Sequence, residues 1–408
     1  MSGSQILTLC TDAVLLVSAS GLFSICLFFL IECTAALFPA TILQTGDRWQ
    51  DAKVAVLVPA HNEELAIGST LEKLTPVLKQ QDRLIVIADN CTDTTAEIAR
   101  AAGATVLERQ DSHQRGKGYA LDYGLRFLES DPPDVVVIVD ADCTVHSGAI
   151  EQLTRYAIAT ERPVQSIYLM TKPKNSKSSK DFVSQFSIIV RNLVRPRGSA
   201  FLRMPCLLNG TGMAFPWSVI RAVNLASGHI VEDMKLGLDL TIAGHKPMFC
   251  PEATVTAYLP PQAQAARSQR TRWEHGHLQI IKAYVPHLLK AAVSQRRFDL
   301  LVSALDLCVP PLSLLVVLWL SLMIITLLCA ILGASWTSVT LVATAGFCFL
   351  MAILVAWAKF ASNDLPLREL LTIPFYVLWK IPVYFKFLVK PQNNWVRTER
   401  DTVHLTKP

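Results

Sequence analysis

The sequence predicts an α/β protein in which a mostly parallel sheet domain is flanked by transmembrane α-helices. Between residues 54 and 139, short apolar runs alternate with helical stretches, which is typical of strands and helices in alternation. No charged residue occurs from Leu307 to Ala358, and Ala13 to Ile31 is also uncharged. Because one span needs about 20 residues, the longer run is expected to hold two spans joined by a turn at Gly333 to Ser338.

The composition indicates a membrane protein. Hydrophobic residues make up 51% of the chain and charged residues only 17%, which is too apolar for an ordinary soluble enzyme. The net charge of +5 is mild and the basic residues gather near the predicted membrane edges, so no nucleic-acid partner is expected. The 10 cysteines include no Cys-x-x-Cys pair. This argues against a disulfide framework or a zinc site and favours reduced thiols in a cytosolic and membrane setting.

Basic residues around the first apolar segment predict its orientation. No Lys or Arg precedes Arg48, so the basic region of a cleaved signal peptide is missing and a retained anchor is expected. Arg48 and Lys53 follow the segment, which places the N-terminus outside and the following domain in the cytosol. Two further spans return the chain to the cytosol. The lysines that agree with this topology are Lys359, Lys380, Lys386 and Lys390.

The chain divides into seven expected segments. Near the C-terminus, charged residues and two prolines, Pro374 and Pro382, predict an interfacial or broken helix rather than a clean span. The segments are an N-terminal transmembrane anchor (1–40), a cytosolic α/β domain (50–280), an interfacial helix (281–305), two transmembrane helices (306–335 and 338–360), the interfacial or broken helix (365–390) and a cytosolic tail (391–408).

Four apolar runs are the predicted strands of the domain: Val54 to Pro59, Leu84 to Ala88, Thr105 to Leu107 and Val135 to Val139. Continuous apolar strands between helices indicate a parallel sheet covered on both faces. Ligands of such sheets bind at the carboxyl ends of the strands. Polar residues follow three of the strands there, namely Pro59-Ala60-His61-Asn62-Glu63, Asp89-Asn90 and Asp140-Ala141-Asp142.

The pair Asp140 and Asp142 is the best local signal for chemistry. Two carboxylates one residue apart, just past a buried strand, can hold a hard divalent cation that neutralises a diphosphate. The alternative is a solvated turn or a helix cap. Asp89 closes another strand and can accept a hydrogen bond from a nucleotide base, although Asp89-Asn90 is also ordinary turn chemistry.

A glycine-rich loop and a later acidic pair add two more candidate groups. Arg115-Gly116-Lys117-Gly118 places two cations before a helix and suits a diphosphate. It matches neither a nucleoside-triphosphatase loop nor a dinucleotide-binding motif, which excludes ATP hydrolysis and hydride transfer. Glu232-Asp233 offers a general base for an acceptor hydroxyl, and its alternative is a helix N-terminus favoured by the helix dipole.

The segment Gln269-Arg270-Thr271-Arg272-Trp273 places a guanidinium group beside an indole. This combination suits phosphate pairing and sugar stacking. The alternative is a basic patch at the membrane edge, where long side chains reach toward water. His275 and His277 follow closely, but no further ligand cluster lies nearby in the sequence, so a metal site there is not expected.

These motifs, in their order along the chain, resemble those of glycosyltransferase family 2. The likeness covers about Val54 to Leu278 and is closest to the membrane-embedded branch, which includes cellulose synthase, hyaluronan synthase, poly-N-acetylglucosamine synthase and ceramide glucosyltransferase. The matching motifs are Pro59 to Glu63, Asp89, Lys117, Asp140-x-Asp142, Glu232-Asp233 and Gln269-x-x-Arg272-Trp273. The resemblance implies a GT-A fold and an inverting, metal-dependent displacement.

The resemblance also implies roles for single residues. Asp89 would read the base, and many relatives carry two adjacent carboxylates where this chain has Ala88-Asp89, which weakens the case for a uridine donor. Asp142, with Asp140, would coordinate Mg or Mn. The implied donor-binding residues are Pro59, Ala60, His61, Glu63, Asp89, Lys117, Asp140 and Gln269. The implied catalytic residues are Asp233 as the base, Glu232 and Arg272, and the implied acceptor-binding residues are Trp273, Gly210 and Thr211.

The expected function is transfer of a sugar from a nucleotide-sugar, with a UDP-sugar favoured, to a lipid-linked or polymeric glycan acceptor. This places the chain in cell-surface polysaccharide or glycolipid synthesis at the inner or plasma membrane, with its catalytic domain in the cytosol. An alternative is a processive synthase that exports its polymer, with polysaccharide-export partners. A remote alternative is a non-catalytic membrane scaffold. The tail around Asn393 to Arg400 suits either a flap over the diphosphate or a membrane-edge anchor.

Overall fold

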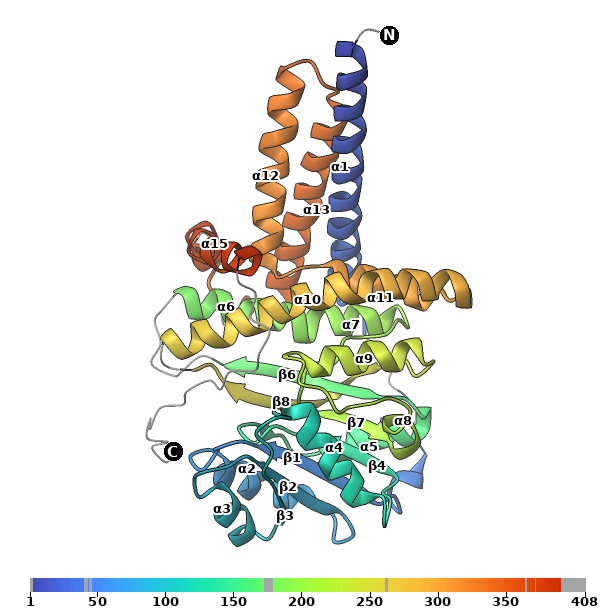
Figure 1. The fold of residues 1–408 in the computed structure, drawn as a ribbon, viewed down its shortest axis with the longest axis vertical. Coiled ribbons are helices and arrows are strands. Elements are labelled where there is room, and N and C mark those ends of the chain that lie inside the picture. Colours follow the sequence, from blue (N-terminus) through green and yellow to red (C-terminus); the bar gives the residue numbers. More distant parts are fainter. Residues whose placement is uncertain are drawn as a thin grey trace.

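Three long apolar helices stand upright on an α/β domain (Figure 1). They are α1 (Gly3–Ala35), α12 (Leu312–Ile331) and α13 (Thr337–Phe360). The computed structural model describes residues 3–39, 43, 46–171, 179–260, 263–363, 365–370 and 372–389. Four helices in this part of the chain are long and apolar enough to cross a membrane, the three upright ones and the stretch Leu367–Phe387. The predicted apolar helices are therefore present, and the turn between α12 and α13 falls where it was expected.

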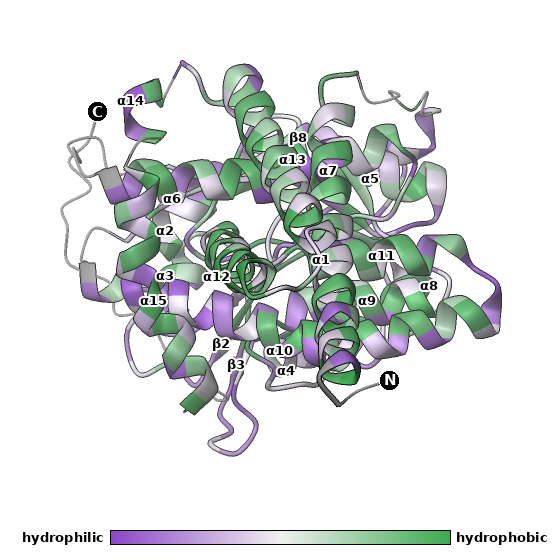
Figure 2. Ribbon diagram, turned by 90° about the horizontal axis from the view of Figure 1, so that it is seen from above, coloured by the Kyte–Doolittle hydropathy of each residue, from purple (hydrophilic) through white to green (hydrophobic). Residues whose placement is uncertain are grey.

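The upright helices pack through small residues and expose large ones. Their mean hydropathy is high, and in the view from above they are drawn mostly in the colours of apolar residues (Figure 2). A Cβ on Gly346 of α13 would lie 2.4 Å from the indole of Trp319 on α12, so only glycine fits there. The Trp319 Nε1–H donates to the carbonyl of Val342 at 2.9 Å. Outward-facing side chains such as Val17 and Ile324 stay exposed, as they do in helices that face lipid.

The domain is built on one eight-stranded sheet with the order β3-β2-β1-β4-β7-β6-β8-β5. The first four strands in this order are parallel, which confirms the predicted parallel sheet. Beyond β4 the sheet is mixed, because β7 runs antiparallel to both β4 and β6 and β5 runs antiparallel to β8. The strands are β1 (Val54–Ala60), β2 (Arg83–Asp89), β3 (Thr105–Arg109), β4 (Val135–Ile138), β5 (Thr144–Val145), β6 (Val164–Thr171), β7 (Met213–Pro216) and β8 (Met248–Tyr258).

Alternating residues of the parallel strands build two cores, so both faces of the sheet are covered as predicted. Val56 of β1 belongs to the core under α2 (Ile67–Leu74) and α5 (Ala149–Thr160). Its neighbour Leu57 belongs to the core under α4 (Lys117–Leu128) and α9 (Glu232–Ile242). The remaining short helices of the domain are Asp47–Trp49, Thr75–Val77, α3 (Thr95–Ala101) and α8 (Trp217–Ile220).

A layer of helices lies between the sheet and the upright helices (Figure 1). The sequence placed an interfacial helix at 281–305, whereas the structure has one long helix from Ala263 to Gln295 and a second from Phe298 to Cys308. Pro286 lies inside the long helix and does not start it, so the Gln269–Trp273 motif is on the same helix. The layer consists of α6 (Ser179–Ile189), a π-helical segment (Val190–Val194), α7 (Arg195–Phe201), α10 (Ala263–Gln295) and α11 (Phe298–Cys308).

A buried ionic junction joins the anchor helix to this layer. Arg195 Nε donates to Glu32 Oε2 at 2.8 Å, and Arg195 also pairs with Asp306 of α11. All three side chains are buried. A Cβ on Gly198 would lie 2.1 Å from the backbone oxygen of Glu32, so the two helices touch through their backbones. The junction was not predicted, because the uncharged stretch that marked the anchor ends at Ile31.

The last described helices are α14 (Leu367–Leu370) and α15 (Ile373–Val389). Figure 1 shows α15 nearly end-on at the foot of the upright helices, so it runs across them rather than beside them. Lys380 of α15 forms a buried ion pair with Glu274 of α10. This arrangement agrees with an interfacial helix, which remains a proposal. The tail 391–408, including Asn393 to Arg400, lies outside the described residues.

Candidate active site

The paired carboxylates Asp140 and Asp142 lie directly after β4, at the carboxyl edge of the parallel strands. The backbone N–H of Asp140 donates to Thr211 Oγ1 at 3.0 Å, which fixes the turn. Carboxylate oxygens of Asp140 and Asp142 and the sulfur of Cys143 lie within 4.8 Å of one another. Burial and the two carboxylates raise the pKa of the Cys143 thiol, so it stays protonated. The two half-buried carboxylates thus offer the oxygen ligands that Mg²⁺ and Mn²⁺ prefer.

Lys117 connects the glycine loop to these carboxylates. Its Nζ pairs with Asp140, donates to the carbonyl of Gly210 at 2.5 Å, and lies 3.9 Å from Glu232 Oε1. Gly116, with φ of +130°, lets the chain turn into α4. Burial opposes the charge on Lys117, but Asp140, Glu232 and Asp233 outweigh it and raise its pKa. Lys117 is therefore a fixed cation in the centre of the acidic group.

Glu232 and Asp233 lie in the first turn of α9, at the helix N-terminus that was the alternative explanation for this acidic pair. They also face the site. Gly210 has φ of +88°, and a Cβ there would lie 3.2 Å from Asp233 Oδ2 and 3.7 Å from Lys117 Nζ. Asp233 and Lys117 therefore flank Gly210. Burial, with the neighbouring Asp233 charge, raises the pKa of Glu232 to about 7.

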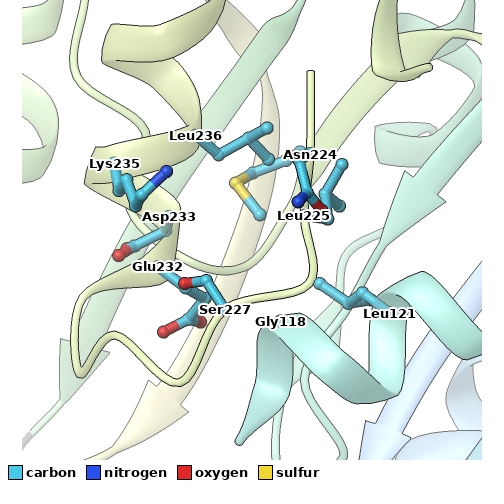
Figure 3. A pocket seen from close by; sticks show the side chains of 10 residues that line it. Gly118, Leu121, Asn224, Leu225, Ser227, Glu232, Asp233, Lys235 and Leu236 are labelled. Atoms are coloured by element: carbon cyan, nitrogen blue, oxygen red, sulfur yellow. The ribbon is translucent and has the colours of Figure 1, made fainter. Parts of the chain in front are cut away.

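A small pocket lies between the first turns of α4 and α9 (Figure 3). Leu121 and Leu225 line its apolar side, and Glu232 and Asp233 lie at its other side. A Cβ on Gly118 would lie 2.6 Å from the carbonyl oxygens of Leu225 and Ser227, so glycine is required for α4 to approach this loop. The close packing fixes α4, and with it Lys117, against α9.

Arg272 reaches the carboxylates from α10. Burial lowers the pKa of its guanidinium, and four carboxylates oppose that shift: Glu232, Asp140, Asp142 and Asp233. Arg272 is thus electrostatically coupled to every acidic group of the site. Trp273 is half-buried and packs against the core on one face of the sheet. Gln269 lies one turn earlier on the same helix and is also half-buried.

The residues expected to bind the nucleotide lie at the ends of β1 and β2. Asp89 is buried, and Arg109 Nη1 pairs with its Oδ1 at 2.6 Å. The His61 ring donates from Nδ1 to the carbonyl of Asp89 at 2.7 Å. The backbone N–H of Glu63 donates to Thr95 Oγ1 at 2.7 Å. Pro59 and Ala60 are the last residues of β1.

Arg109, which pairs with Asp89, was not among the residues that the sequence predicted for the site. It ends β3, is buried, and its guanidinium lies 5.8 Å from the centre of the Tyr119 ring. No motif marks it, and only its place at the carboxyl end of the strand next to β2 could have indicated it.

The structure brings together most of the predicted site residues. Asp140, Asp142, Lys117, Glu232, Asp233, Gly210, Thr211 and Arg272 form one cluster, and Pro59, Ala60, His61, Glu63 and Asp89 line the neighbouring strand ends. The histidines after the motif have structural contacts instead: His275 and His277 each place Nε2 against a backbone carbonyl, of Val383 at 3.0 Å and of Leu307 at 3.1 Å.

The sequence is similar to those of known glycosyltransferases over part of its length. Probable glycosyltransferase YdaM of Bacillus subtilis is 26% identical over 275 residues, which are 61% of this chain and 60% of that protein. 4,4'-Diaponeurosporenoate glycosyltransferase of Staphylococcus aureus is 32% identical over 126 residues, 29% of this chain and 32% of that one. The chain thus spans less than two thirds of the length of these relatives.

A solved structure shares the fold over nearly the whole chain. Mannosyltransferase PcManGT from Pyrobaculum calidifontis, solved in complex with GDP-Man and Mn2+, is 16% identical with a TM-score of 0.54. The match covers 93% of this chain and 99% of that one. At this identity the likeness shows the fold alone. It confirms the predicted α/β sheet domain, which is typical of the GT-A fold, with apolar helices at both of its ends.

A family model described as glycosyltransferase-like family 2 matches residues 51–276, more than half of the chain. The match begins just before β1 and ends on α10 after Trp273. It therefore contains every residue of the carboxylate cluster and the whole sheet, as the resemblance of the motifs predicted. The chain belongs to glycosyltransferase-like family 2.

Proposed function

We propose that this protein is an inverting glycosyltransferase that moves a sugar from a nucleotide-sugar to a membrane-associated acceptor. One observation carries the proposal: the carboxylates Asp140, Asp142 and Asp233 and the cations Lys117 and Arg272 converge at the carboxyl edge of the sheet. Such a set supplies both sides of a displacement, a base for the acceptor and positive charge for the leaving group.

The leaving side of the reaction is assigned to Lys117, Arg272 and the Asp140–Asp142 pair. The two carboxylates fit Mg or Mn, which would supply charge neutralisation for the departing diphosphate. The solved mannosyltransferase holds Mn2+ with its nucleotide-sugar, which supports this choice. Lys117 is already fixed beside Asp140, so it adds a pre-positioned positive charge without reorganisation.

The acceptor side is assigned to Asp233. As the base it takes the proton from the acceptor hydroxyl, whose oxygen attacks the anomeric carbon as the bond to the nucleotide diphosphate breaks. One displacement of this kind inverts the configuration at that carbon. Glycine at position 210 keeps a side chain away from Asp233, because a Cβ there would lie 3.2 Å from Asp233 Oδ2. Thr211 and Trp273 remain the proposed further acceptor contacts.

The nucleotide is assigned to the ends of β1 and β2. Asp89 would accept a hydrogen bond from the base, held in place by Arg109. A UDP-sugar remains the favoured donor, although the solved mannosyltransferase is in complex with GDP-Man. The donor panel described below separates the two nucleotides.

The acceptor is proposed to be a lipid-linked glycan or a glycolipid precursor at the cytosolic face of the inner or plasma membrane. The upright apolar helices directly above the catalytic layer support this placement. A processive synthase that exports a polysaccharide is the second candidate. Three upright helices are few for a closed polymer channel, which favours addition of one sugar or a few.

The test is to reconstitute the full chain in membranes and supply labelled UDP-, GDP- and other nucleotide-sugars with Mn²⁺ or Mg²⁺. We expect one donor to label a lipid-extractable product of small, uniform size. A long polymer would favour the processive alternative. The proposal would be contradicted if the wild-type chain transferred sugar from none of the donors, was no more active than an Asp142→Asn variant, and bound no nucleotide.

A further inference from the structure

A second pocket lies on the membrane side of the active site. It is lined by residues of the π-helical segment, α7, the loop before β7 and α11, among them Arg191, Arg195, Ser199, Cys206, Asn209 and Asp306. This places it in the layer of helices at the foot of the upright helices (Figure 1). None of the residues assigned to the donor lines it.

The two arginines of this pocket differ in how their charge is balanced. Arg195 is neutralised by Glu32 and Asp306 in the ionic junction. Arg191 forms no ion pair with any residue that the structure describes, and its Nη2 donates to Met234 Sδ at 3.6 Å. Arg191 is half-buried. Burial lowers the pKa of its guanidinium, and the carboxylates of Asp233, Glu274 and Asp306 offset that shift only in part, so the cation is not fully balanced. Such a charge is costly unless a ligand completes it.

The segment that carries Arg191 is a π-helix, Val190–Val194, between α6 and α7. A π-helical turn is less stable than the α-helix on either side of it and occurs frequently at functional sites. Within this turn Arg191 contacts Met234, and Arg195 of the ionic junction follows directly after it.

Asn209 adds a second donor to the same pocket. It is 9% exposed, and within the described part of the chain its side-chain Nδ2 has no hydrogen-bond partner. Its backbone N–H donates to Gln165 Oε1 at 2.8 Å, so the position of the residue is fixed. A buried amide donor without a partner is rare in proteins and points to a missing acceptor.

Residues at this pocket are sequence neighbours of residues at the proposed reaction site. Asn209 precedes Gly210, whose carbonyl accepts from Lys117 and whose Cα lies beside Asp233. Met234, the contact of Arg191, follows Asp233 directly. A molecule bound to Arg191 and Asn209 would therefore lie near the proposed base, Asp233, whose charge acts on Arg191.

We infer that Arg191 and Asn209 bind a phosphate group of the acceptor and hold its hydroxyl at Asp233. The inference rests on the proposed function. Both side chains present donors, and the planar fork of arginine with a nearby amide matches the several oxygens of a phosphate. The shared chemistry is a phosphate monoester, which a membrane lipid or a soluble compound can supply. These two residues are positioning residues for the transfer.

The test uses the full chain in phosphatidylcholine vesicles, with two probes: phosphatidic acid in the bilayer, and glycerol 3-phosphate in solution. Because a ligand stabilises the state that it binds, we expect phosphatidic acid to raise the midpoint of thermal unfolding. Arg191→Gln and Asn209→Ala should weaken that binding at least ~10-fold, and Arg191→Lys less so. The matched control is Arg221→Gln, an exposed arginine of the same domain, which should bind normally.

Stability separates this role from a structural one. If Arg191 only balanced buried carboxylates, Arg191→Gln would lower the unfolding midpoint without any probe. A ligand site predicts an unchanged midpoint without a probe, together with loss of the stabilisation by phosphatidic acid. Stabilisation by phosphatidic acid alone assigns the site to a lipid phosphate, and stabilisation by both probes assigns it to the phosphate itself.

Failure of the inference is distinguishable from failure of the proposed function. No stabilisation of the wild-type chain by either probe, or equal stabilisation of Arg191→Gln, overturns the inference. Binding of UDP or GDP with Mn²⁺ is measured on the same preparations. The proposed transferase stands if nucleotide binding persists in all variants, whatever the phosphate probes show.

Discussion

At the scale of single residues, Asp233 is the group on which the proposed chemistry depends. Asp233→Asn should lower the rate of transfer roughly 10²–10⁴-fold, the usual effect of losing a general base. The affinity for the nucleotide-sugar should change little, because Asp233 lies on the acceptor side of Gly210. Rate and donor affinity are measured separately in reconstituted membranes. Near-normal turnover would show that another group takes the proton, and Glu232→Gln would then identify it.

Substitution of Asp142 tests whether the reaction needs a divalent cation. Asp142→Asn should weaken binding of the nucleotide diphosphate in the presence of Mn²⁺ but not in its absence, because it removes one of the two proposed oxygen ligands. Chelation should abolish transfer by the wild-type chain, and Mg²⁺ or Mn²⁺ should restore it. Asp122→Asn is the control, because this half-buried aspartate of α4 pairs with Arg126 outside the carboxylate cluster. Full activity in excess chelator would remove the cation from the reaction.

The buried His277 should make the free energy of unfolding depend on pH. Burial, with the charges of Arg191 and Arg195, lowers its pKa from 6.5 to about 3. The neutral ring, which donates to the carbonyl of Leu307, contributes stability in full above pH 6.5, and that contribution is lost as the pH falls toward 3. Between pH 7 and pH 5 the loss is roughly 2 kcal/mol. A His277→Gln variant should unfold at a temperature that depends less on pH, and equal pH dependence in both chains would exclude this histidine.

At the scale of elements, the buried junction predicts how strongly the anchor is joined to the catalytic layer. Arg195→Leu leaves the carboxylates of Glu32 and Asp306 buried without their cation, which typically costs about 3–5 kcal/mol. The unfolding midpoint in detergent should fall accordingly, and adding Glu32→Gln should recover part of the loss. A normal midpoint for Arg195→Leu would mean that water or another cation compensates the carboxylates.

The elements that the sequence predicted share one physical property. β1, β2 and β4 are buried on both faces and therefore form continuous apolar runs. A helix with one exposed face would instead include polar residues at regular intervals. β6 and β8 were not assigned, because buried residues alternate with half-buried and polar ones along them. β7 was not assigned because it is only four residues long and pairs with strands distant in the chain. The π-helical segment Val190–Val194 was not predicted, because nothing in its local sequence distinguishes it from the α-helices on either side.

The site shows the same division. Asp140, Asp142 and Lys117 could be predicted because they follow strands or begin a helix, where local geometry fixes their direction. Arg109 and Arg191 could not, because each lies in an ordinary local sequence and acquires its place only from tertiary contacts. The buried Arg195 was hidden for a further reason, since its partners are 163 and 111 residues away.

At the scale of the whole molecule, the topology is open to a direct test. Native thiols are replaced, and a single cysteine is introduced at Ser335, between α12 and α13, or at Ser130, after α4. Both positions are exposed. An impermeant reagent added to intact cells should label the first and not the second, because the charge pattern places the domain in the cytosol. The reverse pattern would place the domain outside, away from cytosolic nucleotide-sugars, and would contradict the proposed function.

The ionic junction of Glu32, Arg195 and Asp306 has a geometric consequence for the reaction. Buried charges and touching backbones join the anchor helix to the catalytic layer. The domain is therefore held rigidly against the anchor helix and is not attached through a flexible linker. The proposed base is then carried at a constant height above the bilayer surface. The proposed acceptor, anchored in the same bilayer, would need a polar head long enough to reach that height. After one sugar is added, the new terminal hydroxyl stands farther from the membrane than Asp233 does, which favours release over a second addition.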